Sequence, residues 1–320
     1  MAFLYLALGL AGLFVGSDLA VRGSVAVAHR MNWPTWVTGL LLLALGTSLP
    51  ELFVSAASAV DHPGVAVGNI FGSNAFNALL VLGAVLLLKG NQKLDAHAVR
   101  LPTLVPLVFG SALAFTLLVM PVEAYRFSAL FLLGYLVMIL ASIAGRDASA
   151  EDEVARAPGW GLPLAITATL GGFAVLAVAA KGFLVGALDV AATFGWSDGF
   201  VGYVLTAIGT SAPELFTSVR ALRLGHAGAV FGNVVGSNAF NLLLVGGVVG
   251  LLADARVPQE GLQAQLWTNA FATAVLLVPA LFATGGRRIP AQVYRLSGIL
   301  LLLAYAVSAW WVHASSGPAA

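Results

Sequence analysis

A proline and a glutamate stand together near the middle of two long apolar stretches of this chain. The motif reads Gly-Thr-Ser-Leu-Pro-Glu at residues 46–51 and Gly-Thr-Ser-Ala-Pro-Glu at residues 209–214. Because proline has no N–H to donate, we expect both segments to be locally unwound, with the carbonyl groups of Gly46 and Gly209 freed from helical hydrogen bonds. A charged side chain at the centre of a bilayer costs about 2.5 to 3.5 kcal/mol, so a carboxylate kept there is a candidate functional group.

The composition excludes an ordinary soluble domain. Of the 320 residues, 60% are hydrophobic and only 9% are charged, and the mean hydropathy is +0.95. We therefore predict an all-α polytopic membrane protein. The chain has no cysteine, which excludes disulfides and thiolate metal sites.

Windows of about 19 to 20 apolar residues predict ten transmembrane helices. Their approximate limits are 2–28, 36–59, 64–88, 101–120, 124–144, 161–192, 199–222, 228–252, 267–284 and 290–312. The most polar connector follows the fifth span, so we expect a first five-helix repeat at 1–145, a connector at 146–160 and a second five-helix repeat at 161–316. The first and sixth spans are longer than a straight crossing requires and should be tilted.

Lysine and arginine fall mainly in alternate connectors. Of the 15 in the chain, only Arg126, Lys181 and Arg256 lie on the side opposite to the rest. By the positive-inside rule the richer side is cytoplasmic, which places both termini outside in a multi-pass protein of the cell (inner) membrane.

The two halves repeat each other. Residues 46–55 match residues 209–218, and residues 68–83 match residues 232–247. Because each half has an odd number of spans, the second copy must enter the membrane from the opposite side. This predicts two inverted repeats with broken helices that meet at the membrane midplane, where transporters of this architecture bind their substrates.

Polar residues in the repeated blocks recur at helical spacing and therefore share helix faces. The faces hold Thr47, Glu51, Ser55 and Ser58; Asn69, Ser73 and Asn77; Thr210, Glu214 and Ser218; and Asn233, Ser237 and Asn241. Pseudo-two-fold symmetry predicts that these faces meet at one central point. Such a point offers only oxygen ligands, a set that suits Na⁺ or Ca²⁺ and fits Zn²⁺ or copper poorly.

The charge of the two glutamates has a direct consequence for such a site. Together they balance one Ca²⁺, and without it they need sodium ions, protons or both, because like charges repel in a medium of low dielectric constant. Competition between two kinds of ion for the same carboxylates is the physical basis of exchange.

Some of these residues also have a purely structural interpretation. Ser-x-x-Glu at 48–51 and at 211–214 is a capping box, although two caps at the midplane would be costly. Asn74 and Asn238 remain open between interhelical hydrogen bonds and the ion site. Glycines at four-residue spacing are interpreted as close-packing positions and not as ligands, namely Gly68, Gly72, Gly232 and Gly236.

The blocks GTS-x-PE and GN-x-x-GSN-x-x-N, once in each half, resemble the α-repeats of the sodium/calcium exchangers, in the cation/calcium antiporter superfamily. The blocks cover four spans, and the ten-span plan extends the similarity over nearly the whole chain. Because the central connector is short, the chain is similar to a minimal prokaryotic exchanger that lacks the regulatory calcium-binding domains of animal members.

The resemblance implies that Glu51 and Glu214 are the central ligands shared by Ca²⁺ and Na⁺. It implies further ligands in the backbone oxygens of Thr47 and Thr210, and flanking sodium sites formed around Ser48, Ser211, Ser73, Ser237 and the carbonyls of Ala44 and Ala207. Asn77 and Asn241 stand where the family has asparagine or aspartate. The potassium-dependent branch has an aspartate at the position of Asn241, so potassium dependence is not expected here.

We therefore predict a secondary active antiporter, not an enzyme, that moves Ca²⁺ out of the cytoplasm against inward Na⁺ by alternating access. We expect Ca²⁺ and Na⁺ as transported ions, the lipid bilayer as surroundings, and no cofactor, nucleic acid or protein partner. The alternatives are a proton-coupled (H⁺) cation exchanger that uses the same glutamates and, from another class, a passive cation channel. An intramembrane enzyme is disfavoured because HExxH, GxSxG and a mid-membrane histidine are missing.

Overall fold

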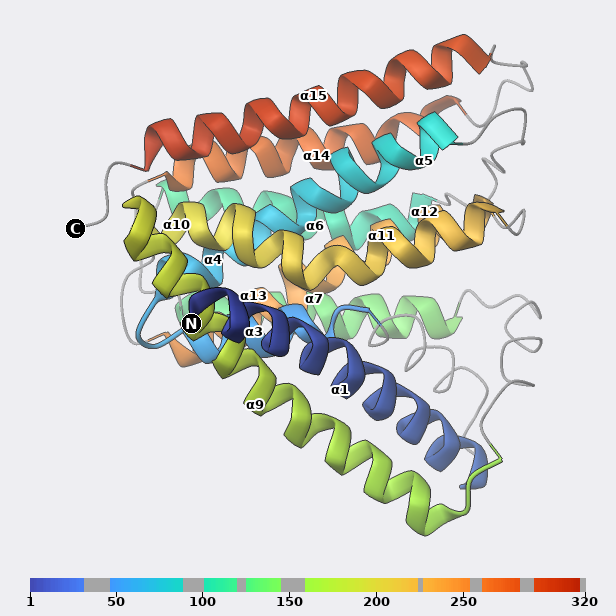
Figure 1. Ribbon diagram of the computed structural model, residues 1–320. Helices are drawn as coiled ribbons and strands as arrows, with labels where there is room; N and C mark the ends of the chain where they lie inside the picture. The colour runs from blue at the N-terminus through green and yellow to red at the C-terminus, as the bar shows by residue number, and fades with distance from the viewer. Residues whose placement is uncertain are drawn as a thin grey trace.

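The computed structural model describes residues 1–31, 47–88, 101–119, 125–144, 159–223, 227–253, 261–282 and 291–316. Every regular element in these residues is a helix (Figure 1). Before the central connector these are α1 (Ala2–Arg30), α3 (Leu49–Ser58), α4 (Pro63–Ala75), the π-helix η1 (Phe76–Val81), α5 (Leu82–Leu88), α6 (Leu101–Val119) and α7 (Tyr125–Ala144). After it come α9 (Leu162–Phe194), α10 (Asp198–Phe200), the π-helix η4 (Val201–Thr206), α11 (Ala207–Arg223), α12 (Ala227–Phe240), the π-helix η5 (Asn241–Val245), α13 (Gly246–Leu252), α14 (Leu262–Phe282) and α15 (Ala291–Ser315).

Burial separates central helices from peripheral ones. Within the described residues, five stretches are long and apolar enough to cross a membrane, namely Ala2–Ser24, Pro63–Leu88, Leu162–Phe194, Val230–Leu252 and Gln292–Ser315. In the second and fourth of these, 83% and 72% of the most apolar window is buried inside the protein, against less than a third in the others. The chain is thus a helical, multi-pass membrane protein with α4–η1–α5 and α12–η5–α13 at its centre, while the count of ten spans stays a prediction.

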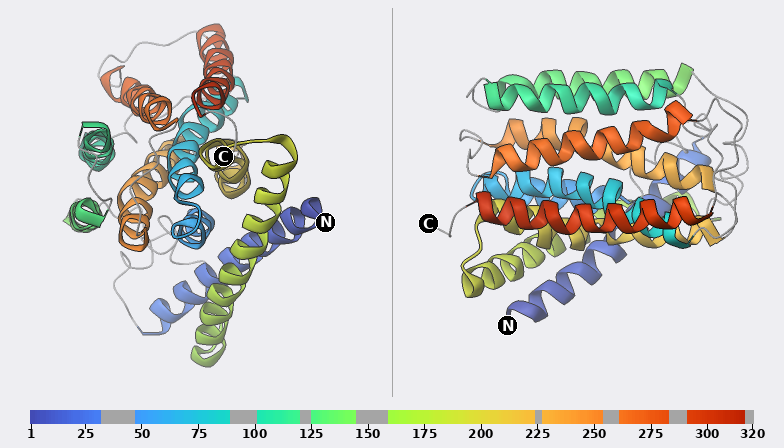
Figure 2. Two further views of the ribbon diagram at one scale, coloured as in Figure 1. Left: turned by 90° about the vertical axis from the view of Figure 1, so that its left-hand side faces the viewer. Right: turned by 90° about the horizontal axis from the view of Figure 1, so that it is seen from above.

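Helices α1 and α9 lie along each other, inclined to the rest of the bundle (Figures 1 and 2). Their backbones approach closely at glycines: a Cβ on Gly12 would come within 2.7 Å of Ala179 Cβ, and a Cβ on Gly16 within 2.9 Å of the Leu176 nitrogen. Residue numbers fall along α9 as they rise along α1, so the two helices are antiparallel. Small residues permit this approach, as is usual between membrane helices.

A second close approach joins α4 to η4. A Cβ on Gly68 would lie 2.8 Å from the Tyr203 nitrogen, and a Cβ on Gly72 would lie 2.6 Å from Tyr203 Cα. The expected close-packing role of these two glycines is therefore confirmed. Gly232 and Gly236 have no such contact within the described part of the chain.

The expected unwinding at the second motif copy is wrong. Helix α11 continues through Pro213 without interruption, and the irregular turn comes earlier, in the π-helix η4 that immediately precedes α11. A helical proline loses one hydrogen bond, but its fixed φ suits the helix, so the helix continues through it. At the first copy, α3 begins at Leu49 with Pro50 in its first turn, after a turn at Thr47 and Ser48, and Gly46 and Ala44 lie outside the described residues.

Candidate ion-binding site

The two motif glutamates are fully buried and are joined crosswise by the motif serines. Ser211 Oγ, on α11, donates to Glu51 Oε1, on α3, over 2.7 Å. Ser48 Oγ, directly before α3, donates to Glu214 Oε1, on α11, over 3.2 Å. Ser48 is the N-cap residue of α3, yet its side chain makes no capping hydrogen bond. The serines thus connect the two motif copies, and the capping-box interpretation does not describe their contacts.

The second repeated block reaches the same carboxylate. Ser237 Oγ, on α12, donates to Glu214 Oε1 over 3.3 Å. Thr47 Oγ1 lies 3.5 Å from Ser237 Oγ. One oxygen of Glu214 is therefore surrounded by hydroxyl groups from both halves of the chain.

Several buried polar atoms of the expected site have no hydrogen-bond partner among the described residues. They are Glu51 Oε2, Glu214 Oε2, Ser73 Oγ and both amide atoms of Asn77 and Asn241. Helix α11 packs against η1, which carries Asn77, and α3 packs against η5, which begins with Asn241. Unpaired polar groups in a protein interior are costly, so their concentration beside the glutamates indicates a site for a polar or charged ligand.

The π-helices place both asparagines at widened turns. The Leu82 N–H donates to the Asn77 carbonyl, and the Gly246 N–H donates to the Asn241 carbonyl, each across five residues. Such turns are frequent at functional sites. The sequence pattern did not predict them.

Asn69, on α4, connects the two motif helices. Its amide Nδ2 donates to Ser55 Oγ over 2.9 Å and to the Glu51 carbonyl over 3.4 Å. Its Oδ1 accepts from Thr206 Oγ1 over 3.0 Å and from Thr210 Oγ1 over 3.3 Å. Within the described residues, the corresponding Asn233 bonds in its own half, to Ser218 and Thr217, so the described hydrogen bonds of the two asparagines differ. Sequence reasoning missed Thr206, because the first copy has leucine at the matching position 43.

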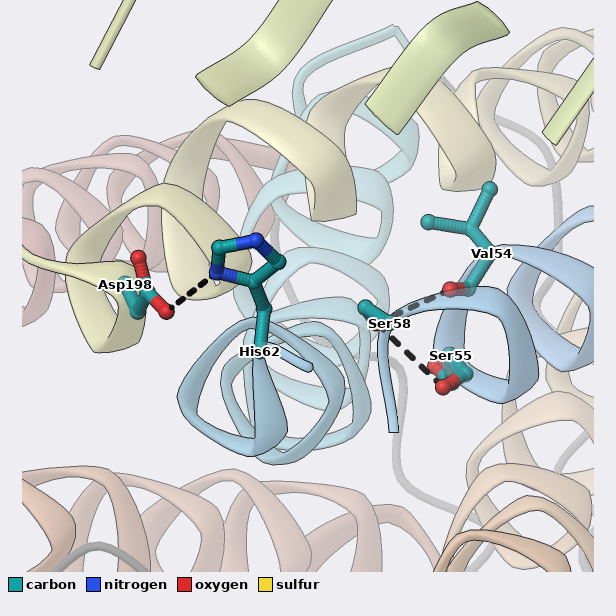
Figure 3. A network of polar contacts seen from close by, with 5 residues as sticks. All are labelled: Val54, Ser55, Ser58, His62 and Asp198. Carbon is teal, nitrogen blue, oxygen red and sulfur yellow. Dashed lines mark hydrogen bonds and ion pairs between the residues drawn. The ribbon is translucent and has the colours of Figure 1, made fainter. Parts of the chain in front are cut away.

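Ser58, which shares the predicted face of Glu51, takes no part in this arrangement. Its hydroxyl donates to the carbonyls of Val54 and Ser55 over 2.9 and 3.2 Å (Figure 3). Beyond it, His62 Nδ1 lies 2.9 Å from Asp198 Oδ2, an ion pair when the imidazole is charged (Figure 3). Within the described residues, the ion pairs are this one and Arg22 with Asp18, so neither glutamate of the site has a basic side chain as partner there.

The remaining expected ligands are placed only in part. Ala207 is the first residue of α11, directly after η4, and Ala44 lies outside the described residues. Asn74 and Asn238 make hydrogen bonds between helices. Asn74 Nδ2 donates to Asn269 Oδ1 on α14, and Asn238 Nδ2 donates to the Asn74 carbonyl. Both residues form interhelical hydrogen bonds through Nδ2, while the Oδ1 atom of each has no hydrogen-bond partner among the described residues, as is also true of Asn77 and Asn241.

Comparison with known proteins identifies the family. The profile of the family described as sodium/calcium exchanger protein matches residues 1–144 and 164–313. This chain belongs to the sodium/calcium exchanger family. The members of this family are transporters and not enzymes, and the buried glutamates therefore lie in the setting of a cation antiporter.

Full-length relatives agree with this membership. This chain is 32% identical over 316 residues to CaxA of Alkalimonas amylolytica, a protein named as a candidate antiporter. The alignment covers 95% of this chain and 96% of that protein. The chain is 29% identical over 343 residues to the sodium/calcium exchanger MaX1 of Methanosarcina acetivorans, with 95% and 96% covered. A solved structure of the sodium-calcium exchanger NCX_Mj matches 96% of this chain and 98% of that one, with 27% identity and a TM-score of 0.60.

Proposed function

We propose that this exchanger-family protein is a secondary active antiporter that exchanges Na⁺ for Ca²⁺ across the membrane by alternating access. The observation that carries the proposal is the pair of buried glutamates, each with one oxygen unpaired and neither with a basic partner in the described residues. Two carboxylates taken out of water need a compensating charge. One Ca²⁺ supplies it, and so do two Na⁺, which makes competition between these ions the basis of exchange.

The proposed ligand set consists of oxygens only. It contains the carboxylates of Glu51 and Glu214, the side-chain oxygens of Ser48, Ser211, Ser73, Ser237, Asn77 and Asn241, and the backbone oxygens of Thr47, Thr210, Ala44 and Ala207. Ca²⁺ takes about six to eight oxygen ligands, with carboxylates and carbonyls among its preferred donors. The unpaired oxygens of the glutamates, Ser73 and the two asparagines support this assignment.

The proposed architecture is ten spans in two inverted five-helix repeats, 1–145 and 161–316, joined by the connector 146–160. The helix directions support it. The first and sixth expected spans, α1 and α9, are antiparallel, whereas the third and seventh, in α4 and η4, run the same way. A chain that crosses the membrane in each successive span requires both relations. The distribution of lysine and arginine supports placing both termini outside the cell membrane.

Alternating access needs one part of the protein to move past another. We assign the movement to the α1–α9 pair, which packs on α3 through apolar side chains including Leu13, Phe183, Leu49 and Val54. An apolar contact of this kind can slide without breaking hydrogen bonds. The chain has no cysteine of its own, so a single introduced disulfide between α9 and α3 should stop exchange, and reduction should restore it. Exchange that continues in the oxidised protein would contradict this assignment.

The deciding experiment is ⁴⁵Ca²⁺ uptake into proteoliposomes loaded with Na⁺ or with acid. It compares the wild type with Glu51→Gln and Glu214→Gln, and with Asp189→Asn as a matched control, because Asp189 is an exposed carboxylate on α9. We expect uptake driven by the sodium gradient, abolished by either substitution in the site and unchanged in the control.

Other outcomes distinguish the alternatives. Uptake driven only by a pH gradient would assign the protein to proton-coupled exchange. Uptake that needs no counter-gradient, together with a lack of counterflow of labelled Ca²⁺, would indicate a passive channel. Full activity in both glutamine variants would refute the proposed site.

A further inference from the structure

A second cluster of buried polar side chains lies outside the repeated motifs. Asn74 Nδ2, on α4, donates to Asn269 Oδ1, on α14, over 3.0 Å. Asn269 Nδ2 donates to Ser111 Oγ, on α6, over 3.2 Å, and Ser111 Oγ lies 2.7 Å from Thr273 Oγ1. All four side chains are buried. The cluster therefore connects a central helix of the ion site to two helices that carry no motif residue.

The position of Asn74 on α4 connects this cluster to the orientation of the proposed ligands Ser73 and Asn77. Successive α-helical residues are about 100° apart, so Ser73 lies about 100° before Asn74 around the helix axis. Asn77 lies three residues after Asn74, at the start of the wider π turn, and comes round to the same side as Ser73. A helix held by Asn74 against α14 therefore presents Ser73 and Asn77 together on the neighbouring face. Both have unpaired polar atoms in the described structure.

The helix of the second half depends on the same anchor. Asn238 Nδ2, on α12, donates to the backbone carbonyl of Asn74 over 3.1 Å. Ser237 and Asn241 stand in the same relation to Asn238 as Ser73 and Asn77 do to Asn74. Among the described residues of α4 and α12, Asn74 is the one bonded to an amide of α14, so a loosened Asn74 would release the orientation of both central helices.

We infer that Asn269 is a positioning residue for ion binding: through Asn74 it fixes the rotation of α4, and thereby the orientation of the Ser73 and Asn77 ligands. This rests on the proposed function, in which Ser73 and Ser237 contribute to flanking sodium sites while the glutamates are shared with Ca²⁺. Loss of the anchor should therefore weaken Na⁺ binding more than Ca²⁺ binding.

The test measures the Na⁺ and Ca²⁺ concentrations for half-maximal exchange in proteoliposomes for the wild type, Asn269→Leu and Asn269→Gln. The matched control is Gln265→Leu, the same amide-to-leucine change one turn earlier on α14, where the buried Gln265 bonds to the Gly199 carbonyl and not to Asn74. We expect Asn269→Leu to raise the half-maximal Na⁺ concentration about three- to tenfold, the equivalent of one lost hydrogen bond. The Ca²⁺ value should change less than twofold, Asn269→Gln should recover part of the loss, and the control should stay near the wild type.

The possible results separate the inference from the proposed function. Equal shifts for Na⁺ and Ca²⁺, an unchanged Na⁺ value, or the same shift in Gln265→Leu would overturn the positioning role while leaving sodium/calcium exchange intact. If Asn269→Leu yields no folded protein, the test uses Asn269→Gln and Ser111→Ala instead. Each should raise the half-maximal Na⁺ concentration, by a smaller factor than expected for Asn269→Leu, and leave the Ca²⁺ value nearly unchanged. The outcomes that would overturn the inference are the same. Wild-type protein that shows no Na⁺-driven exchange would overturn the proposed function, and the inference with it.

Discussion

Substituting alanine for Gly72 tests whether the close approach of α4 and η4 sets the geometry of the ion site. A Cβ at this position would lie 2.6 Å from Tyr203 Cα and 2.7 Å from its carbonyl carbon, whereas ordinary van der Waals contact begins at 3.4 Å. The two helices would have to separate by at least about 0.8 Å, because the Tyr203 carbonyl oxygen lies closer still to the added Cβ. Tyr203 cannot simply step aside, because it is fully buried and its hydroxyl donates to Ser308 Oγ, on α15, over 3.0 Å.

The expected cost follows from this overlap. Inserting a methyl group into a well-packed core costs about 1 to 3 kcal/mol, and alanine recovers about 0.5 to 1 kcal/mol through its better helix propensity. We expect Gly72→Ala to lower the midpoint of thermal unfolding by several degrees. Because Ser73 follows directly in the chain, ⁴⁵Ca²⁺ uptake should fall more steeply than the amount of folded protein.

The matched control is Gly171→Ala, on the exposed side of α9, where a Cβ has no described atom within 4 Å. Its unfolding midpoint should stay unchanged or rise slightly, and its uptake should equal that of the wild type. The stability of both variants is measured by heating the purified proteins and determining the fraction that remains folded by size-exclusion chromatography. A Gly72→Ala protein as stable and active as Gly171→Ala would refute the reasoning from close packing.

The remaining predictions concern polar contacts and ion choice. Asn69→Leu removes four hydrogen bonds to residues of α3, η4 and α11 and should lower ⁴⁵Ca²⁺ uptake at least about tenfold, because buried groups left unpaired cost about 1 to 3 kcal/mol each. Asn233→Leu should lower uptake less, and equal losses in the two variants would contradict the difference between the hydrogen bonds of Asn69 and Asn233. Asp198→Asn should change the free energy of unfolding by no more than about 1 kcal/mol, because its partner His62 and Asp198 itself are 36% and 44% exposed; denaturant unfolding measures this, and a cost of several kcal/mol would show that the pair is a structural anchor. Exchange should proceed equally with and without K⁺ on either side, and a strict requirement for K⁺ in the uptake assay would refute the interpretation of Asn241.

The limits of prediction from sequence are clear at particular residues of the candidate site. The motif serines and glutamates were identified from the sequence because a polar residue in an apolar span is costly and therefore conspicuous. Their partners were not identified. The spacing Ser48-x-x-Glu51 favours a bond within one helix turn, yet each serine bonds to the glutamate of the other copy, more than 150 residues away. Asn269 was visible as a polar residue in an apolar stretch, but nothing local in the sequence connects it to Asn74.

The sequence by itself determined the helical membrane class, the approximate limits of the long helices in the described residues and the duplicated motifs, because apolar runs of membrane length and repeated sequence blocks are local features of the chain. Only the tertiary structure decided the crosswise serine–glutamate bonds, the π-helical turns at Asn77 and Asn241, the uninterrupted helix at Pro213 and the hydrogen bond between Asn74 and Asn269. The physical reason is that a buried hydrogen bond depends on which helices pack together and at what rotation. Packing sums over contacts between residues distant in sequence, and no single stretch of the chain contains that information.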